Sequence, residues 1–209
     1  MTISYLGHAS FLLETKDGTR ILTDPYPQSV LPHPVAAADV VTLSHEHFDH
    51  SDTTQVLGPF QVVKGLQLVT YREVTITCCP CFHDPEGGRL RGENRAYIFR
   101  AEGLKIVHLG DLGEAPSPAL LQAAAGADVL FVPVGGTFTL TGEQAAEAVR
   151  ALRPKLAVPM HFRCPGHDFS VLTTQAPFLA ALSGRPVHRL TELIAPFPAG
   201  VGVLEPLRA

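Results

Sequence analysis

The chain has no tryptophan, only four lysines, and few charged residues overall, at 17% of its 209 positions. Its formal net charge is −4, with acidic residues spread along the sequence. Proteins that bind nucleic acid or anionic membranes normally carry an excess of Lys and Arg, because these partners are polyanions. The charge balance therefore gives no reason to expect either class of partner.

Long apolar runs are also missing. The longest apolar stretch, Ala119–Leu140, is interrupted by Gln122, Asp128 and Pro133, so it is too broken to cross a bilayer. Met1–Leu6 passes directly into a strand-like pattern, without the basic and apolar regions of a secretory signal. We therefore expect a cytoplasmic protein with no membrane association.

Cysteines are few, and their layout does not suit a disulfide framework. Three of the four crowd together at Cys78, Cys79 and Cys81, and the fourth is Cys164. The Cys78-x-x-Cys81 pair matches half of a zinc ribbon, but no second pair follows to complete four ligands. We expect reduced thiols in or beside a strand.

The sequence does contain enough apolar residues, 45%, for a packed core. Its first half reads as strands, and its second half alternates helices with strands, which predicts a layered α/β sandwich. The expected strands are Ile3–Thr15, Thr19–Asp24, Val40–Ser44, pieces of Gln61–Phe82, Ala96–Ala101, Lys105–His108, Val129–Val134 and Leu156–Pro159. The expected helices are Pro118–Ala124, a second one that starts at a Thr141–Gln144 capping box and continues through Leu152, and Val171–Ser183.

The residue type present in excess is histidine, with ten copies. Three of these lie in the segment His45-Glu46-His47-Phe48-Asp49-His50, directly after the apolar run Val40–Ser44. Three imidazoles and a carboxylate so close together are hard to satisfy in a core. As metal ligands they are well placed, since a turn at a strand end can aim His45 and His47 at one divalent ion and Asp49 and His50 at another.

Further ligands are needed to complete two coordination spheres. His83, Asp111 and His161 are metal-binding residue types, and each follows the end of a predicted strand. Loops at strand ends can present polar groups without disturbing the core. The recurrence predicts that these residues join the first four in one site.

With these pieces in place, the sequence resembles the metallo-β-lactamase superfamily of metal-dependent hydrolases over essentially its whole length. Within it, the chain looks most like the branch of L-ascorbate-6-phosphate lactonase-like and related zinc-dependent hydrolases. The motifs that carry the resemblance are Leu6-Gly7-His8-Ala9-Ser10, Leu22-Thr23-Asp24-Pro25, the His45–His50 segment, His83-Asp84, Arg91-Gly92-Glu93-Asn94, Leu109-Gly110-Asp111, Val132-Pro133-Val134-Gly135-Gly136 and Pro159-Met160-His161.

The resemblance implies a single domain over 1–209 with a four-layer αβ/βα sandwich, in which helices flank two mixed β-sheets. It also implies two metal ions along one edge. His45, His47 and His83 would hold the first metal, Asp49, His50 and His161 the second, and Asp111 would bridge them. This donor set suits Zn²⁺, and Mn²⁺ or Fe would also fit. The true β-lactamases have a cysteine at the bridging position, so antibiotic hydrolysis is not expected here.

The expected activity is hydrolysis of a small ester, lactone or phosphodiester by a metal-bridging hydroxide. Asp49 is the expected catalytic residue, since it can orient the nucleophile and pass a proton to the leaving group. Two alternatives stay open: an iron-dependent oxygenase or redox protein on the same scaffold, and a metal-dependent nuclease. The expected partner is a small-molecule substrate, whose contacts and identity the sequence does not reveal, and the oligomeric state stays open.

Several other residues are candidates for support. Asp24 is either a group that hydrogen-bonds the ligand loop or a turn-forming residue, and His8 and His108 are expected in the core or supporting a ligand. Arg91, Asn94 and Arg163 either bind an anionic substrate or stabilise loops, while His33, His167 and His188 are expected to be structural or exposed. If the strand before His83 is regular, Cys79 and Cys81 share its face. Oxidation of Cys81 would then impair metal binding.

Overall fold

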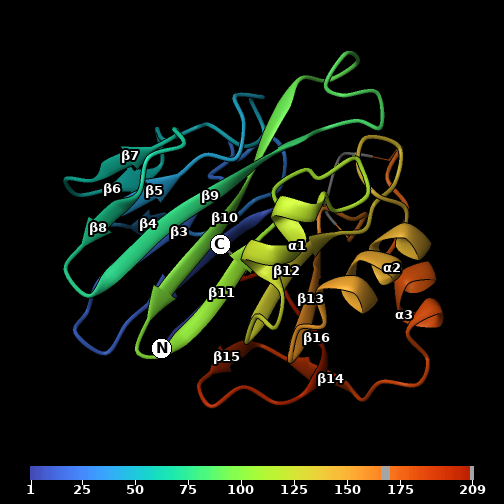
Figure 1. Ribbon diagram of the computed structural model, residues 1–209. Helices are drawn as coiled ribbons and strands as arrows, with labels where there is room; N and C mark the ends of the chain where they lie inside the picture. Colours follow the sequence, from blue (N-terminus) through green and yellow to red (C-terminus); the bar gives the residue numbers. More distant parts are fainter. Residues whose placement is uncertain (166–169, 208–209) are drawn as a thin grey trace.

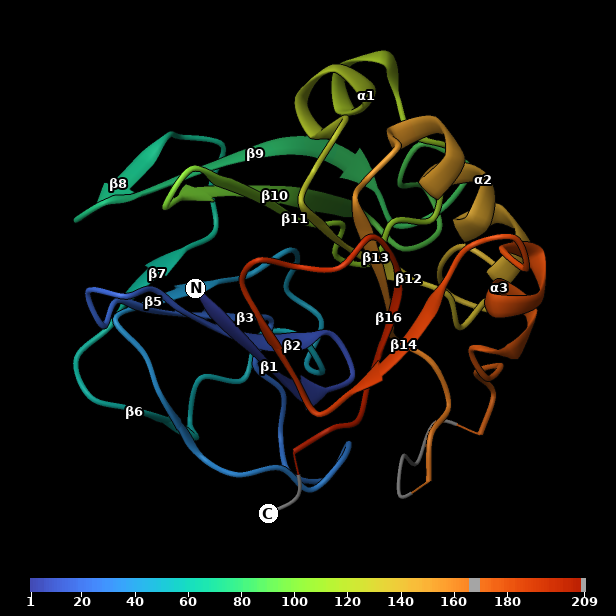
Figure 2. The same ribbon diagram turned by 90° about the horizontal axis from the view of Figure 1, so that it is seen from below.

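Two mixed β-sheets pack face to face in the computed structural model, which describes residues 1–165 and 170–207 (Figures 1 and 2). The six-stranded sheet has the order β15 (Glu192–Ile194), β1 (Thr2–Gly7), β2 (Ser10–Glu14), β3 (Arg20–Thr23), β5 (Val40–Thr42) and β7 (Gln61–Val63). The eight-stranded sheet has the order β14 (Val187–Leu190), β16 (Gly200–Leu204), β13 (Leu156–Met160), β12 (Val129–Pro133), β11 (Leu104–His108), β10 (Glu93–Ala101), β9 (Val74–Phe82) and β8 (Val69–Tyr71). The predicted α/β sandwich is confirmed.

Helices α1 (Pro118–Ala124), α2 (Gly142–Leu152) and α3 (Ala176–Ala181) cover the outer face of the eight-stranded sheet (Figure 1). The capping box of α2 forms as predicted, because Thr141 and Gln144 exchange side-chain to backbone hydrogen bonds. Helix α3 is shorter than the predicted Val171–Ser183. Thr173 donates through both its backbone N–H and its hydroxyl to the Gly135 carbonyl, which holds the preceding segment as a loop.

The outer face of the six-stranded sheet is covered differently. The family resemblance implied helices beside both sheets, but in the described part of the chain this face carries loops and a two-stranded ribbon, β4 (Ala36–Ala37) with β6 (Val56–Leu57). Ala36 packs there with the apolar side chains of Leu22 and Val41. Among the described residues, no helix is long and apolar enough to cross a membrane.

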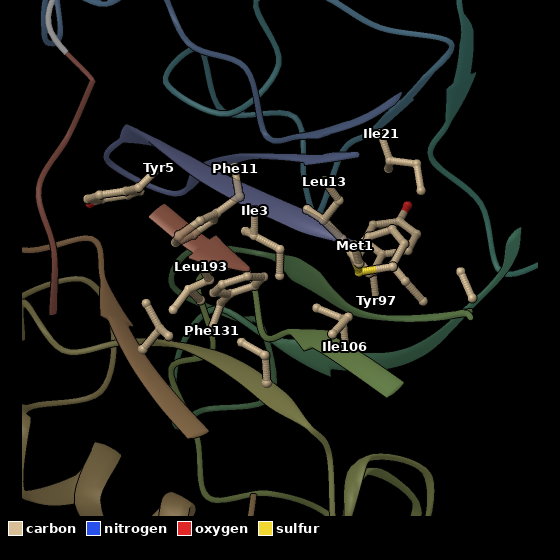
Figure 3. Packing of buried hydrophobic residues seen from close by; sticks show 14 of the residues in the cluster. Met1, Ile3, Tyr5, Phe11, Leu13, Ile21, Tyr97, Ile106, Phe131 and Leu193 are labelled. Carbon is tan, nitrogen blue, oxygen red and sulfur yellow. The ribbon is translucent and has the colours of Figure 1, made fainter. Parts of the chain in front are cut away.

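The main core lies between the two sheets (Figure 3). Alternate residues of β1, such as Ile3 and Tyr5, point inward, as the two-residue period of a strand requires. Phe11 from the six-stranded sheet stacks on Phe131 from the eight-stranded sheet, with ring centroids 3.8 Å apart. This packing fixes the two sheets relative to each other, and with them the loops at their common edge.

Near the end of β5, the sheets are also joined by hydrogen bonds. The buried Tyr97 hydroxyl on β10 lies 3.0 Å from the Leu43 carbonyl and 2.9 Å from the Val63 carbonyl of the opposite sheet. Arg95, two residues earlier, donates to the Ser44 carbonyl from its backbone N–H and its guanidinium. These contacts hold the end of β5 against β10.

Replacing Tyr97 with Phe is therefore expected to lower the free energy of unfolding by about 1–3 kcal/mol, because the buried hydroxyl no longer donates across the sheets and the Leu43 carbonyl is left without this donor. Urea unfolding of the metal-free protein measures this difference. Tyr71→Phe, which removes a hydroxyl from a partly exposed ring, is the matched control and should change stability by less than about 0.5 kcal/mol. Equal unfolding midpoints for Tyr97→Phe and the parent protein would contradict the expectation.

Candidate metal centre

The seven candidate ligands, together with His8 and Asp24, follow the carboxyl ends of strands and meet at one edge of the sandwich. Each comes from a different strand: His8 after β1, Asp24 after β3, His45–His50 after β5, His83 after β9, Asp111 after β11 and His161 after β13. Strand ends can present buried polar groups to one another while the apolar strands fill the core. The candidate ligands therefore lie at strand ends, as the sequence predicted.

The structure brings together all seven residues that were predicted as ligands. His45, His47 and His83 form one group, and His50, Asp49 and His161 join His8 in a second; within each group the possible ligand atoms lie within 4.8 Å of one another.

Asp111 lies between these groups. Its Oδ2 is 3.1 Å from Nε2 of His83, 3.1 Å from Nε2 of His161 and 3.3 Å from Nε2 of His50. Ligand atoms around a tetrahedral zinc ion are separated by about 3.3 Å, given bonds of roughly 2.0–2.1 Å.

Two of the donor atoms also fit a cation because they have no hydrogen-bond partner among the described residues. Within residues 1–165 and 170–207, buried His45 Nε2 and Asp111 Oδ1 have no hydrogen-bond partner. Leaving a buried polar atom unpartnered costs about 1–3 kcal/mol, so such atoms are rare unless they serve a ligand. Imidazole nitrogens combined with carboxylates suit Zn²⁺, and also Mn²⁺ or Fe.

Neighbouring groups fix the orientation of three imidazoles through Nδ1. The acceptors are the Ser44 hydroxyl for His45 at 2.8 Å, the Asp24 carboxylate for His50 at 3.0 Å, and the Phe138 carbonyl for His83 at 3.1 Å. A ring that donates from Nδ1 carries its lone pair on Nε2. The hydrogen-bond network thus assigns the tautomer in which Nε2 faces the cluster.

Asp24 is the hub of this network. Its side chain is fully buried and accepts from the Ser44 backbone N–H at 2.7 Å, the Ser44 hydroxyl at 2.5 Å and His50 Nδ1 at 3.0 Å. Burial raises the pKa of Asp24, but the hydrogen bond from His50 and the nearby imidazoles outweigh it and hold the pKa below 3.8. Its carboxylate therefore lies where the sequence predicted a group that orients the ligand loop.

The pKa shifts of His45 and Asp111 match what a cation requires. Burial, reinforced by the neighbouring His50, lowers the pKa of His45 to about 3, so this imidazole is neutral at pH 7. Burial raises the pKa of Asp111, but His161 and His50 outweigh burial and hold it well below its ordinary value. Neutral imidazole and ionised carboxylate are the forms that bind metal ions. Burial lowers the pKa of His50 and His83, but the Asp111 carboxylate outweighs burial and raises the pKa of both imidazoles, so a metal ion would have to replace a proton there.

The turn that carries Asp111 is held by Asn94, for which the sequence left two roles open, a substrate contact or loop stabilisation. The side chain is fully buried, and its Oδ1 accepts from the Asp111 backbone N–H at 3.0 Å while its Nδ2 donates to the Leu109 carbonyl at 2.8 Å. Gly110 has a φ of +55°, and a Cβ there would lie 2.3 Å from the Asn94 oxygen. Asn94 therefore stabilises the turn and does not face a substrate.

Cys81 also contacts Asn94, whose Nδ2 donates to its sulfur at 3.1 Å. Strand parity is as predicted: Cys79 and Cys81 pack on the helix side of β9, and Cys78 packs against the core between the sheets. However, burial raises the pKa of the Cys81 thiol to about 12, and the side chain is 4% exposed. A buried thiol of this kind reacts slowly with oxidants, so the structure does not favour a redox role.

His8 lies in a turn beside the second histidine group and not within a strand. It lies in the tight turn between β1 and β2 with a φ of +53°, and its Nε2 is 3.2 Å from Asp49 Oδ2. His108, at the end of β11, hydrogen-bonds this turn, with its Nε2 2.8 Å from the Ala9 carbonyl. The glycine before His8 could have indicated this turn in the sequence, since Gly7 adopts a φ of +112° that the turn requires.

The remaining polar candidates take different positions. His33 is buried and hydrogen-bonded to backbone carbonyls, and His188 is partly exposed beside the Ala199 carbonyl. Arg163 is exposed and Arg91 is partly buried beside the first His group, whereas His167 lies outside the described residues.

Comparison with known proteins decides the family. Residues 2–161 match a family model described as the beta-lactamase superfamily domain. A UPF0173 protein of Pyrococcus furiosus is 33% identical, over a match that covers 78% of this chain and 83% of the relative. The chain belongs to the UPF0173 family of the β-lactamase superfamily.

Two further relatives resemble this UPF0173 chain over most of their length. A UPF0173 metal-dependent hydrolase of Carboxydothermus hydrogenoformans is 29% identical, over a match that covers 78% of this chain and 84% of the relative. The crystal structure of a Thermotoga maritima protein, proposed to be a Zn-dependent hydrolase of the metallo-β-lactamase superfamily, has 34% identity, a TM-score of 0.81 and 97% coverage of both chains. The superfamily and its sandwich fold are thus confirmed, while the lactonase-like branch stays a prediction.

Proposed function

We propose that this UPF0173 chain is a hydrolase with two metal ions, zinc in the first instance, which acts on a small ester, lactone or phosphodiester. The observation that carries the proposal is the position of Asp111, whose one oxygen lies within 3.3 Å of imidazoles from both histidine groups. A single closed structural site needs only four ligands. Seven convergent donors with a central carboxylate favour a pair of ions.

Two such ions, when bound, supply a Lewis acid and a water of lowered pKa. The chain's own contribution is orientation. Of the three carboxylates at the site, Asp24 and Asp111 are 0% and 2% exposed at the side chain, whereas Asp49 is 15% exposed. Asp49 is therefore the carboxylate that can contact both the cluster and a bound substrate. It would accept a hydrogen bond from the attacking water, while His8, 3.2 Å away, fixes its position.

Metal analysis tests the proposal directly. Protein purified without chelator should contain two equivalents of metal per chain, and it should hydrolyse members of a panel of lactones, phosphodiesters and thioesters. Removal of metal with a chelator should abolish turnover, and added Zn²⁺ should restore it. Absence of metal would refute the proposal, and iron together with oxygen-dependent turnover would support the oxygenase alternative instead.

Replacing His47 with Ala is the matching test on a single ligand. His47 is exposed, so its loss should leave the fold intact and remove metal from the first group. Groups that merely orient ligands change activity by about 10–100-fold, so loss of a ligand is expected to cost about 100-fold or more. His188→Ala, on edge strand β14 and outside both groups, is the control and should keep the activity and metal content of the parent.

A further inference from the structure

Beside the first histidine group lies a cavity of about 320 Å³. Its walls come from the ligand loop after β5 and from the start of β10, and its lining residues are His45, Glu46, His47, Arg91, Glu93 and Arg95. A volume of this size suits a small ligand, since such sites begin at roughly 300 Å³. Because two expected metal ligands line it, a molecule that reacts at the metals would extend into it.

Arg91 is the residue whose guanidinium is fixed in this wall. Its Nη2 donates to the Thr137 carbonyl at 3.2 Å, and its guanidinium carbon lies 5.5 Å from the centre of the Phe138 ring. The carbonyl of Phe138 in turn orients His83. A guanidinium has five N–H donors in a planar fork, so this anchoring leaves donors for a ligand.

The loop that carries Arg91 is closed around the carboxylate of Asp84. The carboxylate of Asp84 accepts hydrogen bonds from four backbone N–H groups, those of Glu86, Gly88, Leu90 and Arg91, at 2.7–3.1 Å. A loop closed around a buried carboxylate holds its side chains in place before a ligand arrives. The ordering cost on binding is thereby reduced.

The other charged groups of the cavity have different partners. Arg95 donates to the Ser44 carbonyl and lies 3.9 Å from Glu93, so it joins the two sheets. Glu46 pairs with Lys64 at 3.3 Å. The side chains of Glu46 and Glu93 are 70% and 79% exposed, which places both acids at the rim. Solvent screens exposed charges, so they weaken the attraction of the inner wall for an anion only slightly.

We propose that Arg91 binds an oxyanion of the substrate, a carboxylate or a phosphate, at a position remote from the bond that is cleaved. The inference rests on the proposed function, because it assumes that the reacting end of the substrate faces His45 and His47. A planar guanidinium matches both oxyanions through two parallel hydrogen bonds. The substrate class is thus an anionic ester, lactone or phosphodiester, and neutral esters bind less tightly.

Calorimetric binding to the metal-loaded protein tests this without turnover. The ligands are the dicarboxylates succinate, glutarate and adipate, each compared with the monocarboxylate in which a methyl group replaces one carboxylate. One carboxylate occupies the metals in either member of a pair, so the ratio of their affinities isolates the second group. At the best-fitting length we expect the dicarboxylate to bind about 10- to 100-fold more tightly. Phosphonopropionate, compared with succinate, distinguishes phosphate from carboxylate as the preferred oxyanion.

Arg91→Gln should reduce that ratio to near unity, and Arg91→Lys, which keeps the charge and loses the fork, should reduce it only in part. Arg89→Gln is the matched control: it removes a charge from the same loop at a side chain that is 70% exposed and paired with Glu86. It should leave the ratio unchanged. A parent protein with no dicarboxylate advantage, or an advantage that survives in Arg91→Gln, would overturn the inference. Because no hydrolysis is measured, either result is separate from failure of the proposed function.

Discussion

Replacing Asp111 with Asn is expected to remove at least one of the two proposed metal equivalents and to abolish measurable hydrolysis. The substitution keeps the shape of the side chain and removes its charge. Asp111 Oδ2 is the atom that lies within 3.3 Å of His50, His83 and His161. Removing one partner of a buried charged pair costs about 3–5 kcal/mol, which corresponds to two to four powers of ten in metal affinity.

Metal titration by calorimetry and metal content after dialysis measure this loss. Thermal unfolding of the metal-free variant shows whether the fold is kept. Asp128→Asn is the matched control, because Asp128 is also a carboxylate that accepts a backbone hydrogen bond in the eight-stranded sheet, from Lys105, and it lies outside both metal-ligand groups. Two tightly bound equivalents in Asp111→Asn would show that this carboxylate does not link the groups.

The candidate ligand residues could be identified because residue types that bind metal ions are concentrated at a few positions of the sequence. His45, His47, Asp49 and His50 follow an apolar run that has to be a buried strand, and four polar side chains there have no use in a core. His83, Asp111 and His161 were identified because each follows a strand end. Burial of a polar residue is costly, so a metal-binding residue type directly after a buried strand indicates a functional site even when no relative is available for comparison.

The groups that orient these ligands were less visible. Asn94 reaches Asp111 because β10 and β11 pair in one particular register, and its residue type alone fits a substrate contact equally well. The partner of His83 is a backbone carbonyl, that of Phe138, 55 positions away. A carbonyl leaves no signature in a sequence, so contacts of this kind require the assembled fold.

The ends of some strands and helices could not be predicted from the spacing of apolar residues, because turns and tertiary hydrogen bonds determine them. The Ile3–Thr15 stretch was predicted as continuous β-rich chain, yet Gly7 and His8 adopt positive φ values and divide it into β1 and β2. That turn is what brings His8 to Asp49. Similarly, the loop before α3 exists because Thr173 finds an acceptor in Gly135, a contact between separate segments. Tertiary hydrogen bonds overrode the local helical pattern in that case.

Replacing Asp24 with Ala is expected to be the most destabilising single change at the site, with a loss of about 3–5 kcal/mol in the free energy of unfolding. The carboxylate is fully buried, and its removal leaves the Ser44 N–H, the Ser44 hydroxyl and His50 Nδ1 without their acceptor. Asp24 also has a φ of +38°, which Asp tolerates better than Ala does. Denaturant unfolding of metal-free protein isolates this effect from the contribution of bound metal.

Asp24→Asn separates the two roles of the residue. The amide N–H₂ must then face either the Ser44 backbone N–H or the Ser44 hydroxyl together with His50 Nδ1. Stability should still fall by less than in Asp24→Ala, because the amide oxygen remains as one acceptor. Since His50 loses the carboxylate that fixes its tautomer, metal affinity should fall by about 10–100-fold even in the folded variant. Unfolding of Asp24→Ala at the parent's denaturant concentration would mean that water replaces the carboxylate at little cost. The network from Asp24 through Ser44 to His45 and His50 would then be a result of metal binding and not a preformed support for it.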